Sequence, residues 1–442
     1  EQEEGYVLVK EFDGSYYIAL NFLEKYMQIT SQVYESPARA VISYKWQSMQ
    51  TVEAKKDTVV RYQGGIKSPI LSEVKEGDSL QLLEEMENWS RVMTADGLDG
   101  YVQKEDLKAA EETELVYEGS YEENYTSLTR DYKINLAWHQ VTSEAANSAF
   151  DQTMEEVKGV NVVSPTWFSV TGGEGTISSL ASAEYVDKAH AKGMEVWGLI
   201  DNFDENVSTL ETLSKRSART HIIEMLLSEA KRVGMDGINV DFEALTEEEA
   251  PHFIQFIREL SVTCRANNLV LSIDDPVPQY TAFYNRKEQG IVADYVIIMG
   301  YDEHTTGSES AGSVASLPFV EEGIVQTLKE VPREKVINAV PFYTRLWTEN
   351  NNGMVSSEVF GMDQADKYVQ EKGMEVYWNK DVSQNYGELV TAEGTQKIWL
   401  EDEKSLEEKM KLVQQYELAG VAAWKLGFER ADVWEIISKY LQ

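Results

Sequence analysis

The 442-residue chain has a formal net charge of −36, with 42% hydrophobic and 26% charged residues. This composition is typical of a globular protein that is long enough to build at least one large core. The negative charge argues against nucleic acid and against anionic membrane surfaces as partners. No apolar run approaches the ~20 residues that a membrane span requires. We therefore expect no nucleic-acid partner and no membrane span.

The single cysteine, Cys264, excludes a disulfide scaffold and is expected to be a small buried side chain on an apolar helix face. The histidines are scattered without metal-ligand spacing: His139, His190, His221, His252 and His304. We therefore expect no metal site and no cofactor. The chain opens at Glu1 without a methionine, and we expect that a leader or anchor has been removed.

The N-terminal quarter of the chain predicts small β-rich units. Residues 1–55 are expected to form a small α+β or β unit, and residues 56–110 hold short runs of β-formers between turn signals. Within them, "WSRVMTADGLDGYV" predicts a hairpin with Asp-Gly turns. With "VRYQG" and "VKEGDSLQLLEE", this segment resembles a bacterial SH3-like domain. The resemblance implies either contact with cell-wall peptides or a spacer without a ligand. The acidic stretch 111–130 is predicted to be a linker.

Residues 131–442 alternate between strand-like and helix-like patterns. The runs rich in Val, Ile and aromatic residues are 134–141, 160–170, 194–203, 236–245, 268–276, 293–304, 335–347 and 420–429. Between two of them, Phe253, Phe256, Ile257 and Leu260 repeat at the spacing of one helix face. This alternation predicts an α/β fold, a (β/α)8 TIM barrel. The long interval 348–403 predicts a small α+β insertion between the seventh and eighth strands.

The fourth run, "DGINVDFEAL", carries polar side chains along an otherwise apolar strand. Because side chains alternate along a strand, Asn239, Asp241 and Glu243 share one face, which points into a barrel. That face rises toward the C-terminal end of the strand, where barrel active sites lie. The alternative is a buried polar network that only fills the barrel, which is costly for carboxylates. Closely spaced carboxylates push one another's pKa values apart, so we predict a protonated Glu243 as general acid and an ionised Asp241.

These residues resemble the D-x-x-D-x-D-x-E signature of family 18 glycoside hydrolases, the chitinases and their relatives. Its four positions are occupied by Asp236, Asn239, Asp241 and Glu243. "IIMGYD" is similar to the family's sixth-strand motif and "GVAAWKLG" to its eighth-strand motif, so the resemblance covers roughly residues 130–442. The chain resembles most closely the SH3- or LysM-bearing members from spore-forming bacteria, which act on spore cortex or cell-wall peptidoglycan. This implies a location outside the cytoplasmic membrane, in the cell wall or on the spore.

The resemblance implies retaining, substrate-assisted hydrolysis of β-1,4 bonds in polymers that contain N-acetylglucosamine. Glu243 would protonate the glycosidic oxygen while the acetamido carbonyl of the substrate attacks the anomeric carbon. Asp241 would orient the acetamido N–H, and Tyr301 would hold the acetamido carbonyl oxygen. The other residues that it implies for this subsite are Trp424, Asp302 and Met299.

Asn239 departs from the signature, which has an aspartate at this position. An asparagine cannot ionise, but we expect it to donate a hydrogen bond to Asp241 and to keep that carboxylate anionic. Activity is expected to survive with a changed pH profile.

Other candidate residues lie at predicted strand ends. The aromatic ones are Trp138, Trp167, Tyr343 and Trp347, each expected either to stack on a sugar or to pack in the core. Asn202 is predicted to reach the cleft. One of Asp274 and Asp275 is predicted to hydrogen-bond substrate and the other to cap a helix. Trp378 and Trp399 are predicted to wall the groove from the insertion.

Two other functions fit part of this pattern. A catalytically silent, lectin-like protein would bind glycan without cleaving it, and a structural coat or wall protein would use the SH3-like region for attachment. The presence of Glu243, Asp241 and Tyr301 favours the enzyme. The sequence leaves open endo or exo action, the exact polymer and the oligomeric state.

Overall fold

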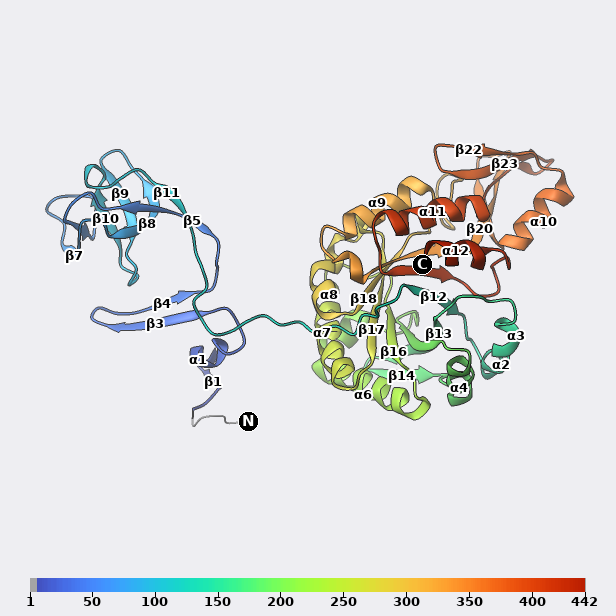
Figure 1. Ribbon diagram of the computed structural model, residues 1–442, viewed down its shortest axis with the longest axis horizontal. Helices are drawn as coiled ribbons and strands as arrows, with labels where there is room; N and C mark the ends of the chain where they lie inside the picture. Colours follow the sequence, from blue (N-terminus) through green and yellow to red (C-terminus); the bar gives the residue numbers. More distant parts are fainter. Residues whose placement is uncertain (1–5, 442) are drawn as a thin grey trace. The chain divides into compact units, whose positions relative to one another are not determined.

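The chain divides into two compact units, Glu1–Asn124 and Tyr125–Gln442, in a computed structural model that describes residues 6–441 (Figure 1). The first five residues of the predicted N-terminal unit lie outside the described residues. Within residues 6–441, every helix is too short or too polar to cross a lipid bilayer.

The N-terminal unit is built from antiparallel strands. Two hairpins, β1 (Val9–Phe12) with β2 (Ser15–Ile18) and β3 (Thr30–Glu35) with β4 (Ala38–Ser43), flank the short helix α1 (Leu20–Leu23). A sheet within residues 48–114 follows, in the order β11 (Glu111–Glu114), β5 (Ser48–Glu53), β8 (Ser79–Glu85), β9 (Trp89–Met93), β10 (Asp99–Gln103), β6 (Thr58–Arg61) and β7 (Ile70–Val74). Strands β9 and β10 pair antiparallel, which confirms the predicted hairpin. The 3-10 helix η1 (Lys104–Asp106) precedes β11.

The C-terminal unit is a closed parallel barrel with helices around it (Figure 1). Its strands are β12 (Ile134–His139), β13 (Val162–Gly172), β15 (Glu195–Asp201), β16 (Gly237–Asp241), β17 (Val270–Pro276), β18 (Tyr295–Met299), β19 (Val336–Pro341) and β25 (Gly420–Trp424). Strand β12 pairs with both β13 and β25, which closes the barrel. Strand β14 (Thr176–Ser179) extends β13 antiparallel at its upper end. The predicted (β/α)8 barrel is confirmed.

Helices cover the outside of the barrel with their apolar faces. They are α2 (Glu144–Ser148), α3 (Phe150–Thr153), α4 (Ala183–Ala191), α5 (Thr209–Ser214), α6 (Arg216–Val233), α7 (Ala250–Ala266), α8 (Arg286–Val292), α9 (Leu317–Thr327), α11 (Glu403–Gln415) and α12 (Val433–Tyr440), with 3-10 turns η2 (Pro278–Tyr280), η3 (Ala282–Tyr284) and η4 (Arg333–Lys335). In α7, the residues predicted to share a face are all fully buried: Phe253, Phe256, Ile257 and Leu260. Helix α6 ends at Gly234, whose left-handed φ of 77° turns the chain into β16.

The insertion lies between β19 and β25. It is a sheet over residues 343–400 in the order β21 (Val355–Gly361), β20 (Tyr343–Asn350), β24 (Gly394–Leu400), β23 (Gln384–Val390) and β22 (Val376–Asn379), with helix α10 (Met362–Lys372) packed on it. The single strand predicted over 335–347 is therefore wrong, because β19 ends at Pro341 and β20 belongs to the inserted sheet. Proline has no N–H to donate, which favours a break in the barrel ladder at this point.

Candidate active site

Strand β16 places polar groups inside the barrel. A side chain at Gly237 would put its Cβ 2.7 Å from the Trp197 ring and 2.9 Å from the carbonyl oxygen of Val270, so only glycine fits there. Asn239, next on the same face, is completely buried. Asp241 ends the strand and is 6% exposed. The predicted column of inward polar residues therefore begins on β16, above the tightly packed glycine.

The Asn239 side chain connects β16 to the neighbouring strand β17 and to β12 and β13, which are not its neighbours in the sheet. Its partners are the Nε1 atom of Trp138 (2.9 Å) and the Oγ atom of Ser164 (3.0 Å), which donate to its Oδ1, and the Oγ atom of Ser272 (3.0 Å) and Oδ1 of Asp274 (2.7 Å), which accept from its Nδ2. Both amide hydrogens are thus committed. The expected hydrogen bond from Asn239 to Asp241 is wrong, because Asp274 receives that hydrogen instead.

Asp241 is surrounded by other acids. Asp201, the last residue of β15, is its register partner on the neighbouring strand. Burial first, and then the charges of Asp274, Glu243 and Asp201, raise the pKa of Asp241 well above its ordinary value. Its Oδ1 atom is buried without a hydrogen-bond partner. These surroundings disfavour the charged form of Asp241, a direction opposite to the ionised Asp241 that the sequence predicts.

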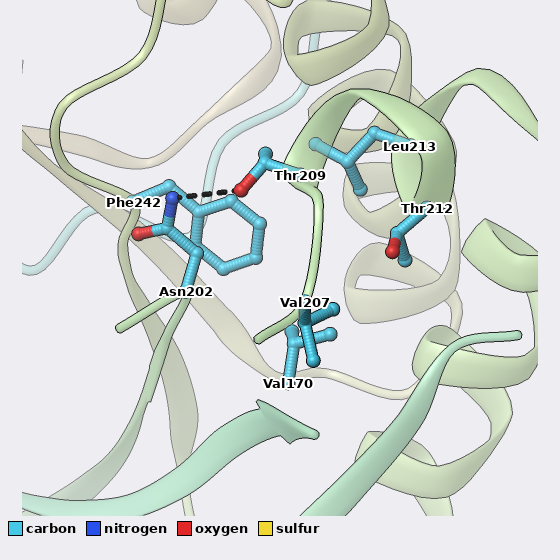
Figure 2. Close-up of a pocket in the computed structure, with 7 residues that line it drawn as sticks. All are labelled: Val170, Asn202, Val207, Thr209, Thr212, Leu213 and Phe242. Atoms are coloured by element: carbon cyan, nitrogen blue, oxygen red, sulfur yellow. Dashed lines mark hydrogen bonds between the residues drawn. The ribbon is translucent and has the colours of Figure 1, made fainter. Parts of the chain in front are cut away.

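Glu243 lies beyond the end of β16, at the mouth of the barrel. The strand predicted over 236–245 ends at Asp241, so the Glu243 backbone has no partner in the sheet. The Asn202 side chain hydrogen-bonds to both backbone groups of Glu243 instead. Its Oδ1 accepts from the Glu243 N–H (2.9 Å), and its Nδ2 donates to the Glu243 carbonyl (3.1 Å). Asn202 Nδ2 also donates to the Thr209 hydroxyl, 3.1 Å away (Figure 2). The next residue, Ala244, has a left-handed φ of 53°, which a non-glycine residue adopts only when its surroundings enforce it.

The pKa of the Glu243 carboxyl group is raised by burial and by the charges of Asp302 and Asp201. A raised pKa lets Glu243 keep its proton to higher pH than an ordinary glutamate, which is the direction that a general acid requires. The direction agrees with the sequence prediction for this residue.

We predict that Asn202→Ala lowers kcat roughly tenfold with little change in KM. The variant loses two hydrogen bonds worth about 1 kcal/mol each, and the acid is then held less well. Asn206→Ala is a matched control, because the Asn206 side chain bonds to Asp204 on the same loop and leaves Glu243 untouched. Steady-state kinetics of the two variants decide the point. A raised KM with unchanged kcat would instead show that Asn202 contacts substrate, as the sequence predicted.

Tyr301 and its neighbours follow β18. Tyr301 is 9% exposed, and burial, Tyr343 and the charges of Asp241, Asp274 and Glu243 raise the pKa of its phenol well above the ordinary value. Asp302 accepts a hydrogen bond of 2.6 Å from the Tyr343 hydroxyl. Met299, the last residue of β18, is 8% exposed. The neutral Tyr301 hydroxyl remains available to donate a hydrogen bond.

Two indoles form the floor between β12 and β25. The rings of Trp138 and Trp424 lie 6.0 Å apart at 58° to each other. Trp138 is 1% exposed and donates to Asn239, so it packs and orients rather than offering a face. Trp424 is partly exposed, which leaves it free to contact a ligand.

The structure separates the remaining candidates. Trp167 and Trp347 are core residues, 2% and 1% exposed, whose indole N–H groups donate to Asn147 and to the Gly312 carbonyl. Asp275 is fully buried, and its Oδ2 atom lies 3.1 Å from the Nε atom of Arg286. It therefore neither reaches a substrate nor caps a helix. In the insertion, the ring centroids of Trp399 and Tyr386 lie 4.8 Å apart. The Lys404 ammonium lies over the Trp378 ring, 3.7 Å from its centroid.

Sequence reasoning missed Asp201. It is 7% exposed, burial raises its pKa, and its charge acts on both Asp241 and Glu243. The signal was present in "GLIDNF", because an aspartate at the C-terminal end of a barrel strand faces the same mouth as the fourth-strand carboxylates.

Buried carboxyl groups and a partly exposed indole at the C-terminal ends of the strands of a (β/α)8 barrel are an arrangement that suits an enzyme cleaving glycosidic bonds. The model of glycosyl hydrolases family 18 matches residues 197–429, more than half of the chain, and the bacterial SH3 domain matches residues 57–108. The chain belongs to glycosyl hydrolases family 18 and is a glycosidase. The predicted family and the predicted SH3-like domain are confirmed.

Several similar proteins come from Bacillus species. The uncharacterized glycosylase YvbX of Bacillus subtilis is 26% identical over 278 residues, which cover 60% of this chain and 80% of that protein. The cortical fragment-lytic enzyme of Bacillus subtilis is 22% identical over 235 residues, 51% of this chain, and this chain spans about half (54%) of its length. The spore cortex-lytic enzyme SleL of Bacillus cereus has the same fold, with a TM-score of 0.64 at 18% identity, covering 75% of this chain and 77% of that one.

Proposed function

We propose that this chain hydrolyses β-1,4 bonds of N-acetylglucosamine-containing polymers, with retention of configuration and with Glu243 as general acid and base. The observation that carries the proposal is the placement of Glu243. Its backbone is fixed at the barrel mouth by Asn202, and burial and neighbouring acids raise the pKa of its carboxyl group. An acid that is held in this way can give its proton to a glycosidic oxygen on a sugar bound across the mouth.

In the proposed first step, the Glu243 proton moves to the glycosidic oxygen as the C1–O bond breaks. The acetamido carbonyl oxygen of the same sugar bonds to C1 and forms an oxazolinium ion, so no carboxylate has to act as nucleophile. Anionic Asp241 accepts a hydrogen bond from the acetamido N–H, and the Tyr301 hydroxyl donates to the acetamido oxygen. In the second step, Glu243 takes a proton from water, and the water oxygen bonds to C1 from the side that the leaving group vacated while the bond between C1 and the acetamido oxygen breaks and restores the acetamido group. Holding the acetamido group in place makes the attack intramolecular, worth up to roughly 7–11 kcal/mol.

We propose peptidoglycan, and spore cortex in particular, as the polymer. This proposal is supported by the similarity of the chain to a cortical fragment-lytic enzyme and to a spore cortex-lytic enzyme. The same relatives support a location outside the cytoplasmic membrane, in the cell wall or on the spore. We propose that the SH3 domain at residues 57–108 contacts the cell wall. Chitin-like polymers are the second candidate substrate.

Proton NMR of the first product released tests the mechanism. With spore-cortex fragments or chitooligosaccharides as substrate, we expect the β anomer to appear first and the α anomer only later, by mutarotation. Release of the α anomer first would contradict the retaining mechanism. Release of no product from either polymer would contradict the proposed activity.

A further inference from the structure

Three carboxyl groups lie side by side on consecutive strands at the upper end of the barrel. Asp201 on β15 is the register partner of Asp241 on β16. On the other side, Val240 pairs with Ile273, so Asp241 and Asp274 are the next residues in register on β16 and β17. All three aspartates are more than nine-tenths buried.

The three carboxyl groups differ in what holds them. Asp201 accepts a hydrogen bond from the Phe203 backbone N–H at 3.1 Å, and Asp274 accepts one from Asn239 at 2.7 Å. The Oδ1 atom of Asp241 has no partner. In the part of the chain that the structure describes, none of the three forms an ion pair with a lysine or arginine.

We propose that Asp241 and Asp274 share a single proton. Asn239 holds the Asp274 carboxyl group in the position where it can accept that proton from Asp241. Two neighbouring carboxyl groups away from water do not both ionise, because each charge raises the cost of the other. The inference rests on the proposed function, in which Asp241 must be anionic. When a substrate N–H approaches Asp241, its proton passes to the Asp274 carboxylate, and the pair keeps one negative charge throughout.

Asn239 makes this division of roles specific. Its amide donates to Asp274 and carries no charge itself, so the inward faces of β16 and β17 carry two acids, Asp241 and Asp274, where an aspartate at 239 would make three. It therefore leaves Asp274 as the neighbour that takes the proton. Asp274 acts through Asp241 and is a positioning residue.

The surroundings of the pair are acidic on every side. The titratable groups that act on it are Asp201 from β15, Glu243 from the loop after β16, Asp275 from β17 and Tyr301 from the loop after β18. Burial is the first cause that raises the pKa of both Asp241 and Asp274, and their neighbouring carboxylates raise it further. These surroundings favour keeping the shared proton at neutral pH.

The test moves the carboxyl group from position 274 to position 239 and the amide from position 239 to position 274. Asp274→Asn removes the acceptor, and we expect kcat to fall about tenfold or more, since a neighbouring charge shifts a pKa by one unit or more. The remaining activity should decline as pH falls through the pKa of Asp241, because the proton must now leave to solvent. The double variant Asn239→Asp/Asp274→Asn restores one accepting carboxyl group beside Asp241 and should recover most of the loss. Asp204→Asn, on an exposed loop, is the control.

Infrared spectroscopy of the full chain tests the shared proton without turnover. In the difference between the wild-type and Asp274→Asn spectra at pH 7, in which the band of a protonated Glu243 cancels, we expect the C=O stretch of a protonated carboxylic acid, and we expect the double variant to regain it. A difference spectrum without this band, or an Asp274→Asn variant with unchanged kcat, would overturn the inference. If no variant and no wild type cleaves glycan, the proposed function fails, and the infrared band still decides the shared proton.

Discussion

Glu243→Gln is expected to reduce kcat by roughly 10²–10⁴-fold, the contribution of a positioned general acid. Glutamine has nearly the same shape and cannot give up a proton to the glycosidic oxygen. The two hydrogen bonds between Asn202 and residue 243 go to the backbone of residue 243, so the substitution leaves them in place. KM should change little, because the substrate-contacting groups around residue 243 remain. Product release from chitooligosaccharides and from cortex peptidoglycan measures the effect.

Glu248→Gln is the matched control, since Glu248 is an exposed acid on the same loop. Equal product from wild type and Glu243→Gln would remove Glu243 from the mechanism. The pH profile adds a second check. The protonated form of Glu243 is the active one, so activity should fall as pH rises through its raised pKa. In Glu243→Gln this decline at high pH should disappear from the residual rate.

The column on β16 was predictable because alternation along a strand is a local rule. It needs only the spacing of Asn239 and Asp241 and the knowledge that barrel interiors lie on one face. The position of Glu243 was not predictable in the same way. Where β16 ends depends on whether neighbouring strands still offer partners, and the partner of the Glu243 backbone is the side chain of Asn202, the residue that follows β15.

The partner of Asn239 shows the same limit. From the sequence, Asp241 is the nearest acid, two residues away on the same face. In the barrel, Asp274 on the adjacent strand lies nearer to the amide, because strands in a parallel sheet are only about 4.8 Å apart. The raised pKa of Asp241 likewise depends on burial and on Asp274 and Asp201, which join the site only when three strands align.

The insertion also combines local and long-range signals. Its existence follows from the long interval before the eighth strand, but its first strand begins at Tyr343, directly after β19. The sequence 335–347 is rich in β-branched and aromatic residues over its whole length and gives no sign of a change of sheet except Pro341. What holds the insertion is a polar network that the sequence does not reveal.

At the centre of that network, Lys409 of α11 and Glu401 form an ion pair with both nitrogen–oxygen distances at 3.0 Å, fully removed from water. Gln384 of β23 also donates to Glu401, and Ser313, in the loop after Tyr301, donates to Gln384. The pair therefore connects the barrel helix α11, the inserted sheet and the loop that follows a site residue. Its loss should affect stability far more than the loss of a surface pair.

We predict that Lys409→Met destabilises the chain by about 3–5 kcal/mol at neutral pH, because it leaves Glu401 buried without its cation. Burial already raises the pKa of Glu401, and Lys409 opposes that shift. Without the lysine, the folded-state pKa rises further above the unfolded value. The folded variant then takes up a proton that the unfolded chain releases, so its stability falls as pH rises through this window. The deficit should be smaller at pH 5 than at pH 8.

Urea unfolding of the full chain, followed at both pH values, measures this deficit. Lys411→Met on the same helix is the control, because Lys411 pairs with Glu408 at the surface and should cost at most about 1 kcal/mol. Adding Glu401→Gln to Lys409→Met removes the buried charge and keeps an acceptor for Gln384, so it should recover part of the loss. If Lys409→Met and Lys411→Met lose the same free energy of unfolding, the buried pair does not stabilise the insertion, because the two lysine pairs differ in their exposure to water.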